Sequence, residues 1–209
     1  MSPLSNFIVY LYPFLTLFAE ENFDIKYFQE KSKQETIEQI VFKKFTPFKN
    51  SNFGVNSLPI WLKVTLSNDT NRTIKKIFEF QDNRLNRIKI YKNDVLNSVI
   101  GDMLPFNNRE LKHPSSAFAM SVDANSEVVY YLRVSNKGSM NLRYVVYEEE
   151  NYKKKISSEN TFYAFYFGAA LIMILYNLIL FFFIKELVFF NYVVYHIFLV
   201  VVMLTLMVF

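Results

Sequence analysis

Hydrophobic and polar residues follow two different patterns along this chain of 209 residues. From about residue 39 to residue 148, apolar and polar residues alternate in short runs separated by Asn, Asp, Ser, Gly and Pro. Period-two alternation is typical of β-strands with one buried face. From residue 162 onward the chain is almost entirely apolar. The pattern predicts a strand-rich domain followed by a segment suited to a membrane.

The clearest predicted strand spans residues 60–67, where one face is apolar (Leu62, Val64, Leu66) and the other is more polar (Trp61, Lys63, Thr65, Ser67). Further strands are predicted at 39–44, 74–80, 87–92, 116–122, 128–135 and 141–147. About eight short strands at this spacing predict a mainly β fold, a sandwich or jelly roll. Residues 20–38 fit an edge strand or a short helix equally well.

Two uncharged runs, 162–184 and 187–209, are separated only by Lys185 and Glu186. As helices, each would be about 34 Å long, against a hydrocarbon core of about 30 Å. We therefore expect two transmembrane helices joined by a tight turn. The polar, lysine-rich residues 151–161 before them are predicted to be a juxtamembrane linker in which cations also meet lipid headgroups.

The first 19 residues contain an uncharged stretch at 7–18 whose length suits a secretory signal better than a spanning helix. Pro13 interrupts it and no cation precedes it, so an uncleaved anchor or a buried strand are the alternatives. Residues 1–19 are accordingly assigned as a signal peptide or N-terminal hydrophobic segment. Residues 20–150 are assigned as the β-sandwich domain.

Charged residues lie almost entirely before the two apolar runs. Their distribution, together with the lack of cysteine, limits the classes of function open to the chain. Of 23 basic and 19 acidic residues, all but Lys185 and Glu186 lie at or before Glu159. The net charge of +4 is spread over mixed signs, which gives no support to nucleic-acid binding. The absence of cysteine excludes disulfides, thiolate metal sites and thiol nucleophiles.

Two signals disagree on orientation. Lys153, Lys154 and Lys155 lie on the domain side of the first span, which by the positive-inside rule favours a cytoplasmic domain. An N-terminal export signal favours the opposite side and is read first. We therefore expect a multi-pass protein of the cell inner membrane with its β domain in the periplasm.

Four stretches follow one another in an order found in a bacterial receptor family: IWLKVTLSN at 60–68, GDMLPFNNRE at 101–110, YYLRVSNKGSMNLRYVVYE at 130–148, and FGAALIMILYNLILFFFIKELVFFNYVVY at 167–195. In this order they resemble the seven-transmembrane receptors with diverse intracellular signalling modules (7TM-DISM). The most specific match is GAALIMILYNL, with Tyr176 and Asn177, followed by the turn with Lys185 and Glu186.

The resemblance implies a sensor. In that family an extracytoplasmic jelly roll similar to carbohydrate-binding modules precedes seven helices and a cytoplasmic kinase, cyclase or phosphatase module. This chain contains only two of those helices. We therefore expect either a receptor fragment or a short sensory piece that passes its signal to a partner chain carrying further spans and an output module.

Catalysis is not expected, and neither a metal nor a cofactor is predicted. The two histidines, His113 and His196, lie far apart in sequence. No HExxH, GxSxG or glycine-rich phosphate loop is present, and the chain has only four glycines.

Ligand binding is the more informative hypothesis, because sugar-binding sheets stack ligands on exposed aromatic rings. Six residues are candidates for a small-molecule or carbohydrate site: Trp61, Lys63, Tyr91, Arg109, Tyr131 and Arg133. Two structural alternatives stand beside this hypothesis. Trp61 would pack in the core, and Arg133 would form a salt bridge with an acid such as Glu79 or Asp102.

Asn177 and His196 are polar residues inside the predicted spans and must face protein. Asn177 is expected to hydrogen-bond across the hairpin, and the small residues 168–170 to allow close helix approach. Either ordinary packing or a signalling switch would explain the two polar residues, with partners from further helices or from oligomerisation. The sequence thus predicts a membrane receptor fragment; a membrane-tethered binding module without output is the alternative.

Overall fold

The computed structural model of this protein describes residues 23–55, 58–105, 111 and 115–208. Within them, the head consists of strands β1 (Phe23–Gln29), β2 (Thr46–Pro47), β3 (Asn52–Val55), β4 (Ile60–Asn68), β5 (Ile74–Phe80), β6 (Arg87–Lys92), β7 (Val95–Ile100), β8 (Ser116–Val122), β9 (Ser126–Ser135), β10 (Ser139–Asn141) and β11 (Tyr144–Glu148), with the short helix α2 (Ile37–Ile40). Two long helices follow, α3 (Glu149–Ile184) and α4 (Leu187–Val208). The predicted signal segment 1–19 and the candidate Arg109 lie outside the described residues.

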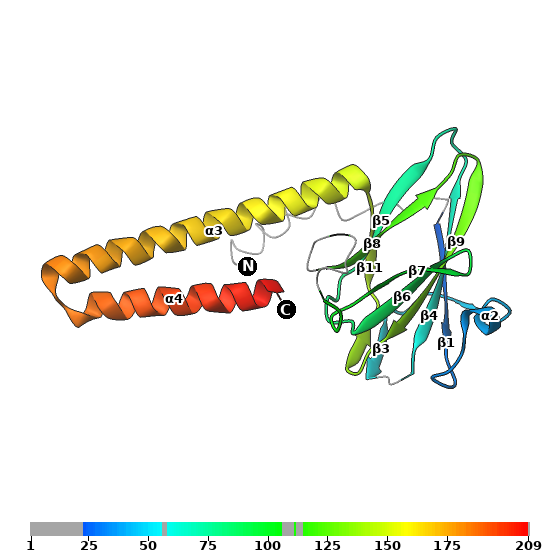
Figure 1. The fold of residues 1–209 in the computed structure, drawn as a ribbon, viewed down its shortest axis with the longest axis horizontal. Helices are drawn as coiled ribbons and strands as arrows, with labels where there is room; N and C mark the ends of the chain where they lie inside the picture. Colours follow the sequence, from blue (N-terminus) through cyan, green and yellow to red (C-terminus); the bar gives the residue numbers. More distant parts are fainter. Residues whose placement is uncertain (1–22, 56–57, 106–110, 112–114, 209) are drawn as a thin grey trace, which may run out of the picture.

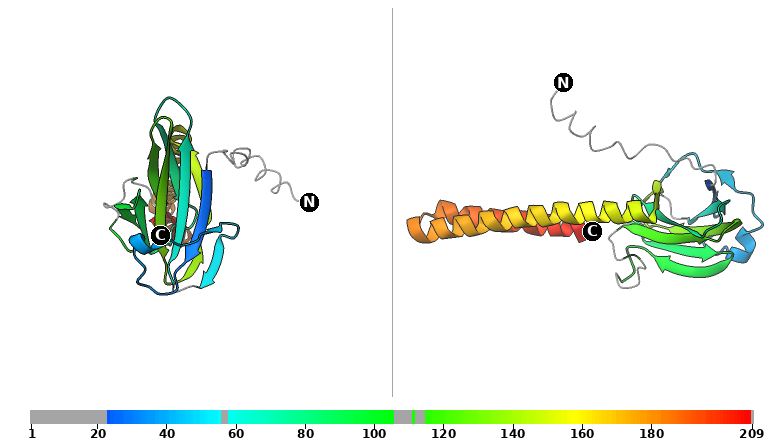
Figure 2. Two further views of the ribbon diagram at one scale, coloured as in Figure 1. Left: turned by 90° about the vertical axis from the view of Figure 1, so that its right-hand side faces the viewer. Right: turned by 90° about the horizontal axis from the view of Figure 1, so that it is seen from above.

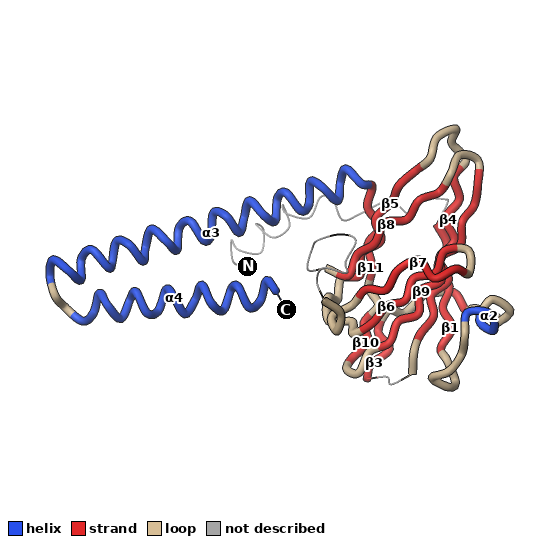
Figure 3. Tube along the Cα trace, viewed as in Figure 1, coloured by secondary structure: helices blue, strands red, loops and turns tan. Residues whose placement is uncertain are grey.

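Two antiparallel sheets form the head. The larger sheet has the order β2-β1-β4-β9-β6-β7, the smaller one has the order β11-β5-β8, and β10 pairs with β3 separately. The strands form the head at one end of the molecule (Figure 1). Alternate residues of both sheets meet in one core, which includes Leu62, Val64, Leu66, Phe78, Phe80, Phe118, Tyr130 and Leu132, each at most 1% exposed. The predicted β-sandwich is confirmed. Figure 3 shows the strands gathered in the head and the helices leaving it.

Most strand boundaries follow the alternation pattern. The strands predicted at 74–80, 87–92 and 116–122 are observed with those bounds. The strands β2, β3 and β7 lie outside all predicted ranges. Each lies at a sheet edge and exposes much of its surface, so that it lacks a regular buried face. In the undecided segment 20–38, both alternatives are present in part: β1 is a strand and α2 begins at residue 37.

The strand predicted at 39–44 is wrong, because α2 ends at Ile40 and a turn and a bend follow it at residues 41–43. The Gln39 side chain accepts a hydrogen bond from the Thr36 backbone N–H at 3.3 Å, an interaction that favours a helix start. Ile37 and Ile40, three positions apart, are both buried. The apolar residues of this segment were therefore spaced for a turn of helix and not for a strand.

The predicted helical hairpin is confirmed as an arrangement of two long helices. The helix α4 returns along α3 (Figures 1 and 2). The rings of Phe181 and Phe190 lie 5.5 Å apart beside the turn. Lys185 ends α3 with a left-handed φ of 60°, and its N–H donates to the Phe181 carbonyl at 2.8 Å. Both helices are long and apolar enough to cross a membrane. Only 6% of the most apolar stretch of each helix is buried within the protein.

The segment predicted as a linker belongs to α3. This helix begins at Glu149, directly after β11, and continues without a break for 36 residues, about 54 Å. Residues 149–161 contain neither Gly nor Pro, and the pair Glu149–Lys153 stabilises the first turns at the favourable i,i+4 spacing. The head and the first apolar run are consequently joined by one continuous helix.

The polar residues of the hairpin bond within their own helices. The Asn177 amide donates to the Met173 carbonyl at 2.8 Å, so the bond predicted across the hairpin is not the one observed. The His196 ring Nδ1 lies 2.8 Å from the Tyr192 carbonyl oxygen. A side chain that reaches back four residues satisfies itself without a partner helix. A side-chain carbon at Gly168 would meet no atom of another element within 4 Å, so α4 does not approach α3 closely at this position.

Candidate functional site

Five of the six predicted ligand residues gather on the outer face of the larger sheet. The register places Trp61 of β4 opposite Arg133 of β9, and Lys63 of β4 opposite Tyr131 of β9. Tyr131 in turn lies opposite Tyr91 of β6. The alternation pattern therefore placed these side chains on the correct face of neighbouring strands.

This face is closed by the segment that contains α2. Trp61 is 0% exposed and Tyr131 is 4% exposed, because Ile37 and Ile40 of α2 pack on them together with several rings and side chains of the surrounding segments. Trp61 consequently has no free surface on which a sugar could stack. The structural alternative, in which Trp61 is a core residue, is the correct one.

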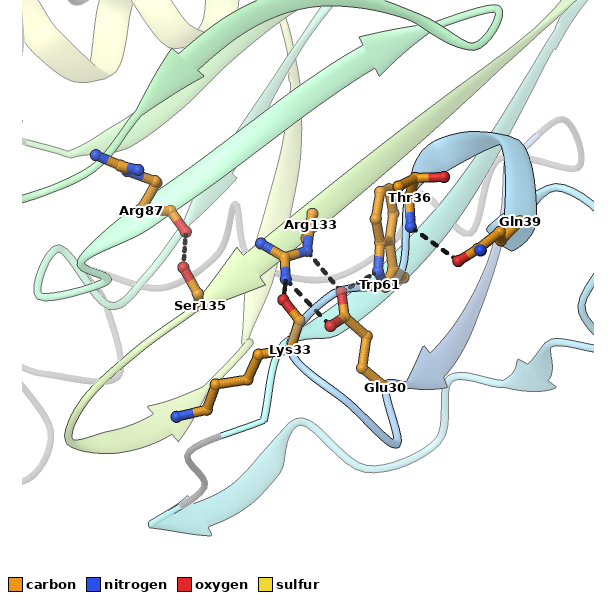
Figure 4. A network of polar contacts seen from close by, with 8 residues as sticks. All are labelled: Glu30, Lys33, Thr36, Gln39, Trp61, Arg87, Arg133 and Ser135. Carbon is orange, nitrogen blue, oxygen red and sulfur yellow. Dashed lines mark hydrogen bonds and ion pairs between the residues drawn. The ribbon is translucent and has the colours of Figure 1, made fainter.

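An ion pair beneath this cover involves Glu30, which follows β1. Its carboxylate accepts hydrogen bonds from the Trp61 indole N–H at 2.6 Å and from the Arg133 Nε at 2.6 Å (Figure 4). Arg133 Nη2 also donates to the second Glu30 oxygen and to the Lys33 carbonyl, each at 3.1 Å. The expected salt bridge of Arg133 exists, but its partner is Glu30 and not Glu79 or Asp102.

The remaining two candidates border this cluster and are half-buried. Tyr91 packs its ring 5.5 Å from that of Trp61, and burial raises the pKa of its phenol. Lys63 holds its ammonium 5.8 Å from the centre of the Tyr131 ring, a cation–π contact. Within the described residues, the predicted ligand site is thus a second, smaller core that fastens the α2 segment to the sheet.

The smaller sheet presents a different outer face, and the first turns of α3 lie across it. Ile77 and Glu79 point outward from β5, and the register sets them beside Ala119 and Ala117 of β8. On the other side, β11 places Tyr147 opposite Ile77. These small neighbours leave room above β5 for side chains of α3.

A buried ion pair holds α3 to this sheet. The Lys155 ammonium donates to both oxygens of Glu79, at 2.7 and 2.6 Å, while the Glu79 side chain is only 4% exposed. The rings of Tyr147 and Tyr152 lie 5.4 and 5.8 Å from the same ammonium. We call these four residues the helix–sheet joint. The joint was not predicted, since residues 79 and 155 are 76 positions apart in the sequence.

The joint favours the neutral form of its phenols. Burial, followed by the charge of Glu79 and a hydrogen bond with it, raises the pKa of Tyr147 to about 12. Burial also raises the pKa of Tyr152, whose hydroxyl lies 3.2 Å from the Ser115 hydroxyl. Both tyrosines therefore stay protonated at neutral pH and keep one carboxylate and one ammonium as the charges of the joint.

A cleft of about 740 Å³ opens beside the joint, between α3 and the smaller sheet. The sheet side contributes Lys75, Ile77, Leu111 and Ala119, and the helix contributes Glu149, Tyr152, Lys153, Ile156, Ser157, Asn160, Thr161 and Ala164. We call it the helix–sheet cleft. The helix residues recur at three- and four-residue spacings and so occupy one side of α3. This stripe could be read from the sequence only by extending the helix back to residue 149.

No group of three or more His, Cys, Asp or Glu side chains in the described ranges is arranged to hold a metal ion. What these residues do provide is a folded head, a charged joint and a helix that continues into an apolar hairpin. The architecture defines the chain as a membrane-anchored β-sandwich domain.

Comparison with protein families identifies the family to which this membrane-anchored domain belongs. The model of the family described as 7TMR-DISM extracellular 2 matches residues 23–148, more than half of the chain, and the chain belongs to this family. The resemblance to the 7TM-DISM receptors is thereby confirmed. The matched range includes all the described strands and ends where α3 begins.

Two solved structures are similar to the head. A family 35 carbohydrate-binding module from Clostridium thermocellum has 8% identity and a TM-score of 0.29 over 59% of this chain and 89% of its own. A CBM35 from Paenibacillus barcinonensis has 16% identity and a TM-score of 0.28, covering 57% of this chain and 91% of its own. No curated protein matches the chain.

The family and the two apolar helices together make this a membrane protein with an extracellular, receptor-type sensing domain. Two of the lysines that favoured the opposite orientation have acidic partners: Lys155 is paired with Glu79 of the head, and Lys153 lies 2.6 Å from Glu149 of its own helix. Two of the three cations are thus partly neutralised by neighbouring carboxylates.

Proposed function

We propose that the sandwich senses a small ligand, such as a carbohydrate, or a protein partner in the periplasm, and that α3 passes the resulting change to helices in the cell inner membrane. The supporting observation is the continuity of α3. Its first turns are fastened to the smaller sheet by Glu79 and Lys155, and its last turns form the first apolar run. A displacement of the sheet would therefore be transmitted along a single rigid element.

The helix–sheet joint suits a switch between two arrangements. A ligand shifts such an equilibrium only by the difference between its affinities for the two states. Separating Lys155 from Glu79 leaves a buried carboxylate without its cation, which disfavours intermediate positions. The joint would therefore have two states, one with Lys155 and Glu79 in contact and one with them apart. A ligand that binds the head more tightly in one of these states would increase the population of that state.

The output lies beyond these residues. In this proposal, further spans and a signalling module come from a partner chain or from the rest of a longer receptor, and self-association of the hairpin is one route to that contact. The chain acts by binding, with no catalytic step of its own. It contacts membrane lipid but not nucleic acid.

The first experiment tests the side of the membrane. A reporter active only outside the cytoplasm and one active only inside are each fused after Tyr147. We expect activity from the external reporter alone. Activity from the cytoplasmic reporter alone would overturn the periplasmic sensor.

The second experiment tests transmission. Because the chain has no cysteine, spin labels can be placed uniquely at Glu127→Cys on β9 and Glu186→Cys in the hairpin turn of the full chain in lipid nanodiscs. We expect a narrow distribution of label-to-label distances that broadens in Lys155→Met. The matched variant Lys154→Met, at an exposed lysine of the same helix that does not line the helix–sheet cleft, should leave it narrow.

The two outcomes separate the receptor from its alternative. If the distribution is broad in the unmodified protein and does not change in Lys155→Met, the head moves independently of the spans. The chain would then be a tethered binding module without transmission, and the proposed coupling would be rejected.

A further inference from the structure

The helix–sheet cleft differs from the closed face of the larger sheet in its chemistry. We propose that it binds an anionic phospholipid of the surrounding bilayer, with the headgroup near Lys75 and Lys153 and an acyl chain along α3 toward the membrane. The inference rests on the proposed function only in placing residues 162–184 in the bilayer.

The length and direction of the cleft match this ligand. Its helix side runs from Glu149 to Ala164, about 22 Å along the axis. Ala164 belongs to the uncharged run that begins at residue 162, so this end of the cleft opens at the level where α3 enters the bilayer. Phe162 and Phe165 are 63% and 79% exposed there, and exposed rings are typical of the membrane interface. A lipid could thus enter the cleft from its membrane end.

Along that direction the lining is first charged, then apolar in the centre, and then consists of the short side chains Ser157, Asn160, Thr161 and Ala164. Lys75 and Lys153 lie at the end farthest from the bilayer, together with Glu149, which accepts a hydrogen bond from Lys153 at 2.6 Å. Two cations and one carboxylate leave this end with one excess positive charge. The central part is lined by Ile77 and Ile156. An anionic head and an apolar tail complement these two regions.

The same features disfavour a sugar. The aromatic residue that lines the cleft is Tyr152, and its side chain is buried with its hydroxyl beside Ser115. It therefore offers no exposed ring for stacking, and the apolar centre would leave sugar hydroxyls without partners. A lipid in the cleft would lie next to Lys155 and Glu79, so that its binding bears on the joint between head and helix.

The experiment uses the full chain reconstituted in vesicles of equal parts phosphatidylglycerol and phosphatidylcholine, followed by native mass spectrometry of the protein released in detergent. We expect one tightly retained phosphatidylglycerol in preference to phosphatidylcholine. Ala119→Trp, which fills the cleft from β8, should abolish retention. Ala169→Trp, an equal change at an exposed position of α3 outside the cleft, should preserve it.

A second pair of variants keeps the test independent of folding at β8. Lys75→Gln with Lys153→Gln should weaken the preference for phosphatidylglycerol about fivefold per lysine. Lys49→Gln with Lys137→Gln, two exposed lysines that do not line the cleft, should leave it unchanged. Circular dichroism of each variant verifies that the head is folded.

Three results would overturn the lipid site: no retained lipid, equal retention of both lipids, or retention that survives in Ala119→Trp. Glycerol phosphate, the soluble headgroup, is added as a competitor. If it displaces the lipid at millimolar concentration, the cleft recognises a free phosphate ester and the acyl chain is not part of recognition. The spin-label distances report on transmission separately, so either proposal can fail while the other stands.

Discussion

The two outer faces of the sandwich are covered in opposite ways. The α2 segment lies on the larger sheet so closely that Trp61 is wholly buried, whereas α3 lies on the smaller sheet and leaves a cleft of about 740 Å³. Each cover is fastened by one buried carboxylate and one cation, Glu30 with Arg133 and Glu79 with Lys155. Similar chemistry therefore gives a closed face in one case and an open one in the other.

The difference comes from what surrounds each ion pair. Beneath α2, two isoleucines and several rings fill the space, and the planar Arg133 guanidinium contacts both Glu30 oxygens in a fixed geometry. Beneath α3, the helix offers short polar side chains, and the cation is the flexible ammonium of Lys155. The first arrangement suits a permanent cover, and the second suits a joint that can change.

The largest effect is expected at the closed face. Trp61→Ala removes a fully buried indole and should lower the free energy of unfolding of the head by about 3 to 5 kcal/mol. Chemical denaturation of the full chain in detergent, followed by the strand signal in circular dichroism, measures it. Trp61→Phe keeps most of the packing and should lower the free energy of unfolding by clearly less than Trp61→Ala. A loss below about 1 kcal/mol for Trp61→Ala, the range expected at exposed positions, would contradict the closed face.

Breaking the ion pair of the same face should cost nearly as much. Arg133→Met strands the Glu30 carboxylate, which is fully buried, and should destabilise the head by about 3 kcal/mol or more. The double variant Glu30→Gln with Arg133→Met removes both charges and should recover part of that loss. The denaturation midpoints of the unmodified protein, the single variant and the double variant measure both the loss and the recovery of stability. Equal stability of the single and double variants would mean that Glu30 is not buried as a charge.

At the open face the equivalent change should cost less. Lys155 is 29% exposed, and Glu79 keeps its hydrogen bond with Tyr147, so Lys155→Met should lower the stability of the head by about 1 to 3 kcal/mol. Lys154→Met changes an exposed lysine of the same helix outside the cleft and should change it by less than about 0.5 kcal/mol. If the two variants behave alike in thermal unfolding, the joint does not hold α3 to the sheet.

The smallest effect is a pH dependence at the joint. The pKa of Tyr147 is about 12 in the folded head and near 10 in an unfolded chain, so folding favours the protonated phenol. This contribution is complete below pH 10 and is lost as the pH rises toward 12, where the unfolded phenol is ionised first. Unfolding midpoints measured across this range should fall more steeply for the unmodified protein than for Tyr147→Phe. If the midpoints of the two proteins fall in parallel with pH, the Tyr147 phenol is exposed to water in the folded head and the joint does not bury it.

The sequence predicted the strands well where one face is continuously buried. The ranges 74–80, 87–92 and 116–122 agree with the structure, because each alternates between core and outer face without interruption. It also predicted that Tyr131 and Arg133 share a face. It failed at 39–44, where the capping of α2 at Thr36 outweighs an apparent alternation over six residues.

The candidate ligand site shows the limit of this reasoning. The pleat of a strand determines which side chains share a face, but not what lies over that face. The cover came from residues far away in sequence: Glu30 is 103 positions from Arg133. An exposed aromatic row and a buried one have the same alternation pattern, so the sequence could not separate a sugar platform from a second core.

Local periodicity, charge distribution and run length were enough to determine an alternating β domain, two apolar helices and the absence of thiol chemistry, because each depends on neighbours along the chain. Only the tertiary structure decided that Trp61 is closed in, that Glu79 pairs with Lys155, and that a cleft lies beneath α3. Those properties depend on segments that are distant in sequence and meet only when the sandwich closes and the helix packs against it.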